Sequence, residues 1–310
     1  MNKELYEFMR RIESRILETL PEGEWQINER SIPQNNGKAE AVCITREGSN
    51  REAVLYMEPL FEAYKNGESF ENICARLDRT VAEVCRGFEF PEPMKGIDEI
   101  FKEYGRNILM QLVETGKNTE LLKEMPHREY MNLSVIYRID IYSEGATVPV
   151  TNQIAEKFGL TEEELFERAR RYVPEAYPLL VSSLSAVLET PMFFVGPDEM
   201  PMLLISYGRG FYGASVLMDP DALKQAADKI GGDIYILPAS VHELIAVPYA
   251  GSDEKYLLDM VRMINRTEVE RKDVLSDCVY HYDRERGQLE VIEAETERSA
   301  DRDPGNEYTM

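Results

Sequence analysis

The sequence predicts an α+β protein with mixed or antiparallel sheets and helices packed on them, divided into two subdomains. Apolar residues recur at three- and four-residue steps in some segments and alternate with polar residues in others, as in amphipathic helices and strands. The strand-like segments come in pairs separated by helices, which is typical of sheets with helices on one face. Hydrophobic residues make up 43% of the 310 residues and charged residues 30%, so we expect a substantial core.

The first part of the chain follows an α-β-β-β-α-α pattern. The expected elements are, in order, a helix at 5–20, strands at 25–32, 39–45 and 53–57, and helices at 60–66 and 70–86. The first helix ends before Pro21, and the Asn36-Gly37 pair favours a tight hairpin turn between the first two strands. Gly67 is suited to end one helix, and Ser69 is suited to cap the next.

Two proline-containing breaks divide the middle of the chain, one at 90–93 and one at Met125-Pro126. The expected elements from the first break onward are a helix at 96–104, a strand at 108–113, a short helix at 120–124, and strands at 132–142 and 146–150. Thr151 and Thr161 stand where helix caps would, and Thr161 to Glu164 has the capping-box pattern. We therefore interpret this acidic run as a helix start.

The C-terminal third is the most regular part of the chain. The expected elements are strands at 202–206 and 212–218, a helix opened by Asp219-Pro220, strands at 234–237 and 244–247, a helix at 252–264, and a hairpin of 278–282 with 289–292. We expect an N-terminal α+β subdomain at 1–125, a C-terminal α+β subdomain at 126–292, and a disordered acidic tail at 293–310, because the tail is polar and aperiodic.

The formal net charge of -22 is the strongest compositional feature. Such a field repels phosphate backbones and anionic lipid, so direct binding of nucleic acid is disfavoured. The excess of carboxylates has two interpretations, which charge alone does not separate. One is general solubility, and the other is a surface that binds a basic partner or mimics DNA.

Composition also predicts the compartment. No apolar run approaches the roughly 18 to 20 residues that span a bilayer, and the N-terminus has neither the basic nor the apolar region of a signal peptide. The four cysteines (Cys43, Cys74, Cys85 and Cys278) are far apart, in no C-x-x-C spacing, as is typical of reduced core thiols. We expect a cytoplasmic protein without membrane association and without zinc.

A glycine motif, Gly208-Arg-Gly210-Phe-Tyr-Gly213, matches the G-x-G-x-x-G pattern of dinucleotide-binding sites after a predicted strand. The residues that follow it predict another strand, so no helix N-terminus is expected to hold a pyrophosphate. A glycine loop between strands also covers ATP in protein kinases, but the other kinase motifs are missing. We favour a glycine-rich hairpin, with Arg209 and Gly210 as candidate ligand-contacting residues.

His242-Glu243 begins like the zinc-protease motif H-E-x-x-H, but Ala246 occupies the position of the second histidine. We therefore expect His242 to make a structural hydrogen bond or to line a groove, and we retain His242 and Glu243 as candidate ligand-contacting residues. The three histidines are widely spaced, and Cys43 and Cys278 lie in apolar alternations typical of core residues. No catalytic, cofactor-binding or metal-binding residue is assigned, and no cofactor is expected.

Four stretches of the sequence together resemble a known family. They are 55–67 (LYMEPLFEAYKNG), 132–138 (NLSVIYR), 235–243 (YILPASVHE) and 274–283 (VLSDCVYHYD). Asn35-Asn36-Gly37 and 146–152 (ATVPVTN) fit the same pattern. The chain is similar, over about Leu5 to Ile292, to a family of uncharacterised bacterial proteins of mostly gut Firmicutes, domain-of-unknown-function family number 5688. The resemblance implies a bacterial cytoplasmic protein and supplies no activity, cofactor or catalytic residue.

Three hypotheses for function remain open. The first is a noncatalytic binding or regulatory protein with an unknown protein or small-molecule partner, because no complete catalytic or cofactor motif is present in a chain that should fold. The second is an enzyme of an unrecognised type, such as a hydrolase, with a site near Arg209 and His242. The third is an acidic DNA mimic or protein-interaction module, which requires carboxylates in rows.

Overall fold

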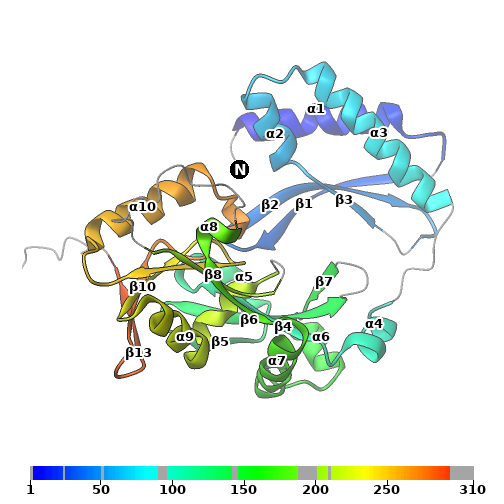
Figure 1. Cartoon of the computed structure of the whole chain (residues 1–310). Coiled ribbons are helices and arrows are strands. Elements are labelled where there is room, and N and C mark those ends of the chain that lie inside the picture. Colours follow the sequence, from blue (N-terminus) through cyan, green and yellow to red (C-terminus); the bar gives the residue numbers. More distant parts are fainter. Residues whose placement is uncertain are drawn as a thin grey trace, which may run out of the picture. The chain divides into compact units, whose positions relative to one another are not determined.

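The computed structural model of the chain describes residues 3–23, 25–49, 52–89, 96–141, 146–187, 201–208 and 211–293 (Figure 1). These residues form helices and antiparallel sheets, which confirms the predicted α+β class. The chain forms two compact units, Met1–Gly105 (unit 1) and Arg106–Met310 (unit 2). No helix among the described residues has the length and apolar character needed to cross a bilayer.

Unit 1 contains a three-stranded antiparallel sheet whose one face is covered by the first three helices of the chain (Figure 1). Its elements are α1 (Lys3–Thr19), β1 (Trp25–Gln34), β2 (Gly37–Arg46), β3 (Glu52–Tyr56), α2 (Glu58–Lys65), α3 (Phe70–Glu89) and α4 (Ile97–Tyr104). The predicted hairpin turn is present, because Gln34 pairs with Gly37 and both Asn36 (φ 61°) and Gly37 (φ 144°) have positive φ angles.

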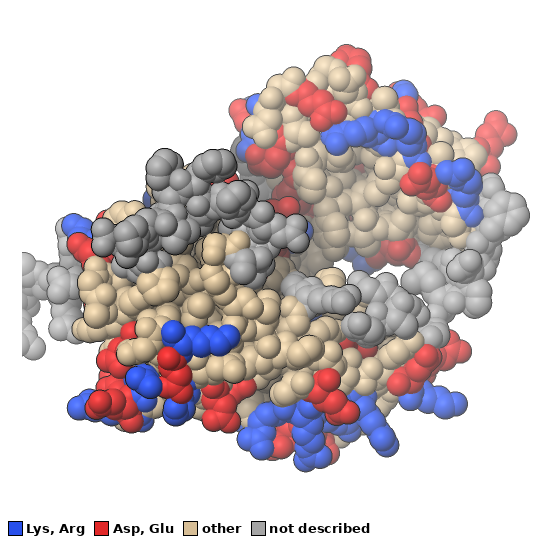
Figure 2. Space-filling model, in the orientation of Figure 1, with Lys and Arg blue, Asp and Glu red and all other residues tan. Residues whose placement is uncertain are grey.

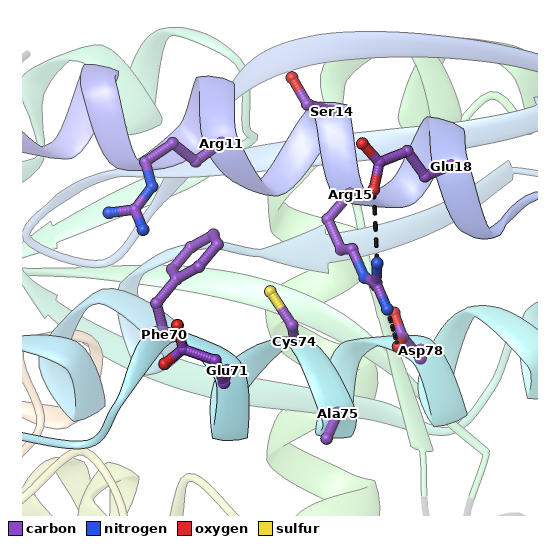
Figure 3. Close-up of a pocket in the computed structure, with 9 residues that line it drawn as sticks. All are labelled: Arg11, Ser14, Arg15, Glu18, Phe70, Glu71, Cys74, Ala75 and Asp78. Atoms are coloured by element: carbon purple, nitrogen blue, oxygen red, sulfur yellow. Dashed lines mark hydrogen bonds and ion pairs between the residues drawn. The ribbon is translucent and has the colours of Figure 1, made fainter.

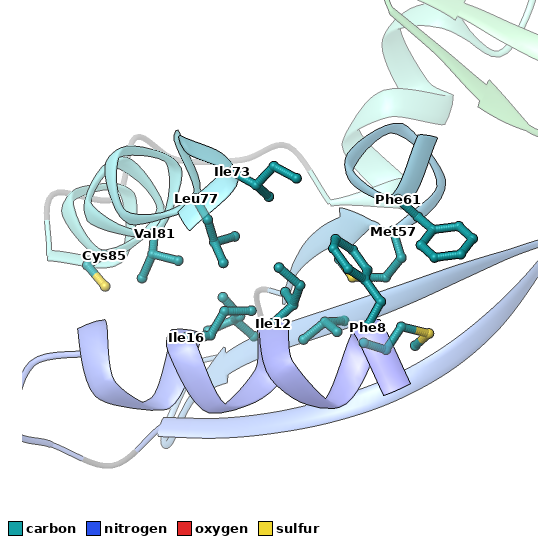
Figure 4. Packing of buried hydrophobic residues seen from close by; sticks show 12 residues of the cluster. Phe8, Ile12, Ile16, Met57, Phe61, Ile73, Leu77, Val81 and Cys85 are labelled. Carbon is teal, nitrogen blue, oxygen red and sulfur yellow. The ribbon is translucent and has the colours of Figure 1, made fainter. Parts of the chain in front are cut away.

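The core of unit 1 lies between the sheet and its helices (Figure 4). It contains Phe8, Met9, Ile12 and Ile16 of α1, Val42 and Ile44 of β2, Met57 and Phe61, and Ile73, Leu77, Val81 and Cys85 of α3. The α1 residues are among those whose three- and four-residue spacing predicts the helix. Burying each such side chain contributes about 1.5 to 3 kcal/mol, so this stripe determines which face of α1 meets the sheet.

The first sheet of unit 2 is built around β6 (Leu133–Ile141). One edge of β6 pairs with β4 (Ile108–Glu114), and the other edge pairs first with β5 (His127–Tyr130) and then with β7 (Ala146–Pro149). The other elements of this region are η1 (Gly116–Asn118), α5 (Thr119–Lys123), α6 (Asn152–Lys157) and α7 (Glu162–Ala176).

The predicted capping box starts α7. The backbone N–H of Glu164 donates to Thr161 Oγ1 at 3.2 Å, and the N–H of Thr161 donates to Glu164 Oε2 at 2.9 Å. Two otherwise unsatisfied donors are thereby paired. The pKa of Glu164 is lowered because its carboxylate accepts hydrogen bonds from Thr161, first from the backbone N–H and second from the hydroxyl, which lies at 3.1 Å. The acidic run is therefore a helix start, as the sequence predicts.

The second sheet of unit 2 has six antiparallel strands in the order β13-β12-β10-β11-β9-β8. The strands are β8 (Leu179–Ser183), β9 (Leu203–Tyr207), β10 (Ile234–Pro238), β11 (Leu244–Pro248), β12 (Val279–Asp283) and β13 (Gln288–Ile292). The helical elements are α8 (Leu184–Val187), η3 (Gly213–Met218), α9 (Pro220–Ile230), α10 (Glu254–Thr267) and η4 (Arg271–Asp273). Helices α9 and α10 lie on opposite faces of the sheet (Figure 1), whereas the sequence pattern suggests helices on one face. Every residue of β10 is consequently buried.

Two further observations differ from the sequence-based expectations. Residues 213–218 form the 3₁₀ helix η3 instead of a strand, and Gly213 to Leu217 are all buried, so their apolar run carries no helical period. The unit boundary falls before β4, whereas the expected subdomain boundary at 125 would separate β4 from β6, with which it pairs over its whole length. Beyond Glu293, the predicted tail lies outside the described residues.

Candidate functional site

The four candidate residues from the sequence fall on two loops of unit 2. His242 and Glu243 lie between β10 and β11, and both are partly buried. Arg209 and Gly210 lie outside the described residues, so the glycine motif is represented by Gly208 and by 211–213. These described parts of the motif and His242 are in direct contact.

Glycine is required at both ends of the motif. Gly208 has φ +54°, and a Cβ atom there would lie 2.7 Å from the Tyr177 ring. A Cβ atom on Gly213 would lie 2.1 Å from Ser206 Oγ and 2.6 Å from the carbonyl oxygen of His242. Because real Cβ atoms do not approach other atoms so closely, the two glycines hold the motif against its neighbours.

His242 binds the motif through its side chain. The backbone N–H of Tyr212 donates to Nδ1 of His242 at 3.1 Å, and the two rings lie 5.5 Å apart. Tyr212 has φ 54°, in the left-handed region that aromatic residues rarely occupy. Nδ1 therefore accepts a hydrogen bond, and the proton of the neutral ring is on Nε2, which lies 3.5 Å from Asp273 Oδ1. Both ring nitrogens of His242 are engaged, as expected for a structural histidine.

Glu243 has no comparable role. Its backbone oxygen accepts a hydrogen bond from the N–H of Ser240 at 3.2 Å. Its carboxylate has no hydrogen-bond or ion-pair partner among the residues that the structure describes. His242 and Glu243 are thus adjacent in sequence but differ in what they contact.

The sequence did not identify Arg138, whose guanidinium lies against the ring of Tyr212. This β6 residue is partly buried; its Nε donates to Thr147 Oγ1 at 2.7 Å, and Nη1 donates to Gln111 Oε1 at 3.4 Å. Its guanidinium carbon lies 5.1 Å from the centre of the Tyr212 ring. Burial lowers the pKa of Arg138, and only the Tyr212 hydroxyl acts in the opposite direction. No described carboxylate lies within 4.0 Å of this guanidinium.

Asp140 lies two residues along β6 and therefore on the same face of the sheet. It is 3% exposed, and its Oδ2 accepts hydrogen bonds from the hydroxyls of Tyr172 (2.7 Å) and Tyr177 (2.6 Å). Tyr177, which donates to Asp140, packs against Gly208 at the start of the glycine motif. Arg138 packs against the ring of Tyr212, near the end of the motif. Two charged residues in an otherwise apolar strand are the signal that could have identified this site from the sequence.

The remaining candidate groups lie elsewhere. His127 Nδ1 lies 3.0 Å from the backbone oxygen of Met125, and His281 lies 3.7 Å from Asp233. Burial raises the pKa of Cys43 and Cys278, so both thiols are protonated at neutral pH. Within the described ranges, no group of three or more His, Cys, Asp or Glu side chains is arranged to hold a metal ion.

No curated protein and no solved structure matches this chain. A family model described as a family of unknown function, DUF5688, matches residues 5–284, which include all of the residues around the glycine motif. Since the match covers most of the chain, the protein belongs to the DUF5688 family.

Proposed function

We propose that the protein is a noncatalytic binding protein that takes an anionic ligand at Arg138, beside the glycine motif of unit 2. The observation that carries this proposal is a partly buried guanidinium without a carboxylate partner among the described residues. A cation removed from water costs several kcal/mol, and proteins normally compensate it with an acidic group. An oxyanion bound to Arg138 would supply the missing negative charge.

The composition of the chain strengthens this argument. There are 57 acidic and 35 basic residues, so carboxylates are available for every arginine. Arg128 on β5 illustrates the usual arrangement, because it pairs with Glu162 at 2.8 Å and also with Glu163. On β6, by contrast, the nearby Asp140 is bound by two tyrosine hydroxyls. The carboxylate of β6 is thus engaged by hydroxyl donors and does not pair with Arg138.

The geometry of the site favours binding over turnover. A general base needs a free lone pair, but Nδ1 of His242 already accepts the N–H of Tyr212. Arg138 supplies a planar set of donors that suits a carboxylate or a phosphate, and Tyr212 supplies an aromatic face above it. These groups recognise a ligand and do not provide a nucleophile.

The charges on the face drawn in Figure 2 do not favour the DNA-mimic hypothesis. On the face drawn in Figure 2, Lys and Arg side chains lie among the Asp and Glu side chains, and the carboxylates do not form uninterrupted rows. A mimic requires such rows at phosphate-like spacing. Mixed charges are instead typical of an ordinary solvated surface.

The proposal is tested by thermal unfolding of the full chain with phosphate, sulfate or acetate at constant ionic strength. We expect at least one of these oxyanions to raise the melting temperature of unit 2, since a ligand at 100 times its Kd adds about 2.7 kcal/mol. Arg138→Met should abolish the response. It should also leave the protein without oxyanion at least as stable as wild type, because it removes an uncompensated charge.

Arg170→Met is the matched control, because Arg170 is 67% exposed on α7 of the same unit. It should retain the response to the oxyanion. The proposal is wrong if no oxyanion stabilises the wild-type protein, or if Arg138→Met responds to the oxyanion as wild type does.

A further inference from the structure

Unit 1 contains a groove of about 510 Å³ between α1 and α3 (Figure 3). Its volume lies within the roughly 300 to 1,000 Å³ of small-molecule sites. None of the residues that line it belongs to the cluster around His242, so a ligand in this groove is independent of the function proposed for unit 2. The two ends of the groove differ in how their charges are paired.

At one end the charges compensate each other. Arg15 donates to both carboxylate oxygens of Asp78, at 2.9 and 2.6 Å, and lies 3.3 Å from Glu18. Thr19 donates a further hydrogen bond to Asp78 at 3.0 Å. This network leaves no charge at this end in need of a ligand.

At the other end two opposite charges stay separate. The Arg11 guanidinium lies over the Phe70 ring, with 3.6 Å between its carbon and the ring centre, and Nη1 donates to the Tyr64 hydroxyl at 3.5 Å. No described carboxylate lies within 4.0 Å of Arg11, and no described cation lies within 4.0 Å of Glu71. In Figure 3 the Phe70 ring lies between these two groups, which project from α1 and α3 respectively.

Between the two ends, Cys74 directs its sulfur into the groove (Figure 3). The residue is 9% exposed, and burial raises the pKa of the thiol despite the neighbouring Arg15. A protonated thiol is a small apolar surface and a poor nucleophile. The exposed Ala75 beside it is also small, so a ligand can approach α3 closely here.

We infer that the Phe70 end of this groove binds a small zwitterion, such as a free amino acid or a very short peptide. The ligand's carboxylate pairs with Arg11, its ammonium group pairs with Glu71, and its side chain lies over Cys74 and Ala75. The Arg11 guanidinium, held over the Phe70 ring, offers a planar set of N–H donors, which suits a carboxylate. A ligand with only one charge would leave either Arg11 or Glu71 without a partner.

Calorimetric titration of the full chain with L-leucine, L-phenylalanine and glycylglycine tests this inference. We expect at least one of them to bind, and removal of either ligand charge to weaken binding at least about tenfold. For leucine, the probes are N-acetyl-L-leucine, which lacks the ammonium group, and L-leucinamide, which lacks the carboxylate. The inference is overturned if none of the three ligands binds at millimolar concentration, or if the modified ligands bind as well as their parent.

Two variants assign the charges. In Arg11→Gln, binding should be weak and no longer sensitive to amidation of the ligand. In Glu71→Gln, it should be weak and no longer sensitive to acetylation. Arg76→Gln is the control, because Arg76 pairs with Glu68 at 2.9 Å and does not line the groove, so it should bind as wild type. Equal affinities in wild type, Arg11→Gln and Glu71→Gln would place the ligand elsewhere and contradict the inference.

Discussion

Nδ1 of His242 accepts the backbone N–H of Tyr212 at 3.1 Å and thereby holds an aromatic residue in a left-handed conformation. This contact joins two segments that the sequence identifies separately, the glycine motif and the His-Glu pair. It also places the Tyr212 ring over Arg138. His242 thus positions the Tyr212 ring by holding the backbone of the glycine motif. We therefore expect its replacement to lower the stability of the protein.

Replacement of His242 by alanine should destabilise unit 2 by about 1 to 3 kcal/mol, because the Tyr212 N–H loses its acceptor. His242→Asn should recover part of this loss, since the amide oxygen of asparagine can occupy the position of Nδ1, and His242→Gln should recover less. Urea denaturation followed by circular dichroism measures the differences. In the control Glu243→Ala the loss should stay within about 0.5 kcal/mol, because no described group pairs with that carboxylate. Equal stabilities for His242→Ala and Glu243→Ala would contradict this prediction.

Gly213→Ala should destabilise the protein by about 1 to 3 kcal/mol or more, because its Cβ would lie 2.1 Å from Ser206 Oγ and 2.6 Å from a backbone oxygen. Gly232→Ala is the matched control, since nothing lies within 4 Å of a Cβ at that position. It should be neutral, or stabilising by about 0.4 to 1 kcal/mol through the unfolded chain. Thermal unfolding of the two variants measures the difference, and an undiminished melting temperature for Gly213→Ala would show that the motif packs differently.

Much of the fold could be predicted from the sequence because its signals are local. The apolar spacing of α1, the Asn36-Gly37 turn and the Thr161 capping box each depend on neighbours within a few residues, and all three are present. The strand predicted at 212–218 was wrong because burial on all sides removes the period that separates a helix from a strand. Helices on both faces of β10 erase its alternation for the same reason.

The candidate site could be predicted only in part. The spacing of glycines and the His-Glu pair pointed to two loops, but their contact depends on β9 and β11 being neighbours in the sheet. Arg138 and Asp140 stand out in the sequence as two charged residues in a largely apolar strand, but nothing local reveals that Arg138 lacks a carboxylate partner. That property depends on where every carboxylate of the chain lies, and only the tertiary structure determines it.

Tyr177→Phe should destabilise unit 2 by about 1.5 to 3 kcal/mol, because the buried Asp140 carboxylate loses one of its two tyrosine donors. Tyr172→Phe should have a similar effect. The two effects should not add, because both hydroxyls bind the same oxygen atom. Urea denaturation followed by circular dichroism measures the losses. Tyr256→Phe, on the exposed face of α10, is the control and should leave stability unchanged. A neutral Tyr177→Phe variant would mean that water replaces the lost donor.

The Arg15–Asp78 pair should make the free energy of unfolding of unit 1 fall as the pH is lowered into the acid range. The hydrogen bond from Arg15 lowers the pKa of Asp78 below its ordinary value of 3.8. A carboxylate of this kind contributes its full stability above that ordinary value and loses the contribution as pH falls through the lowered pKa. The destabilisation caused by Asp78→Asn should therefore be constant near neutral pH and shrink below about pH 3.8.

The only tryptophan, Trp25, lies in β1 and contacts Phe88, so its fluorescence during urea denaturation reports on unit 1. The pH dependence should become smaller when Asp78→Asn is made in an Arg15→Gln background, because the largest contribution to the lowered pKa is then missing and the hydrogen bond from Thr19 remains. The measurement compares the free energy of unfolding of wild type with that of Asp78→Asn. If the difference stays constant from about pH 7 to about pH 2.5, Arg15 does not bind the carboxylate in solution.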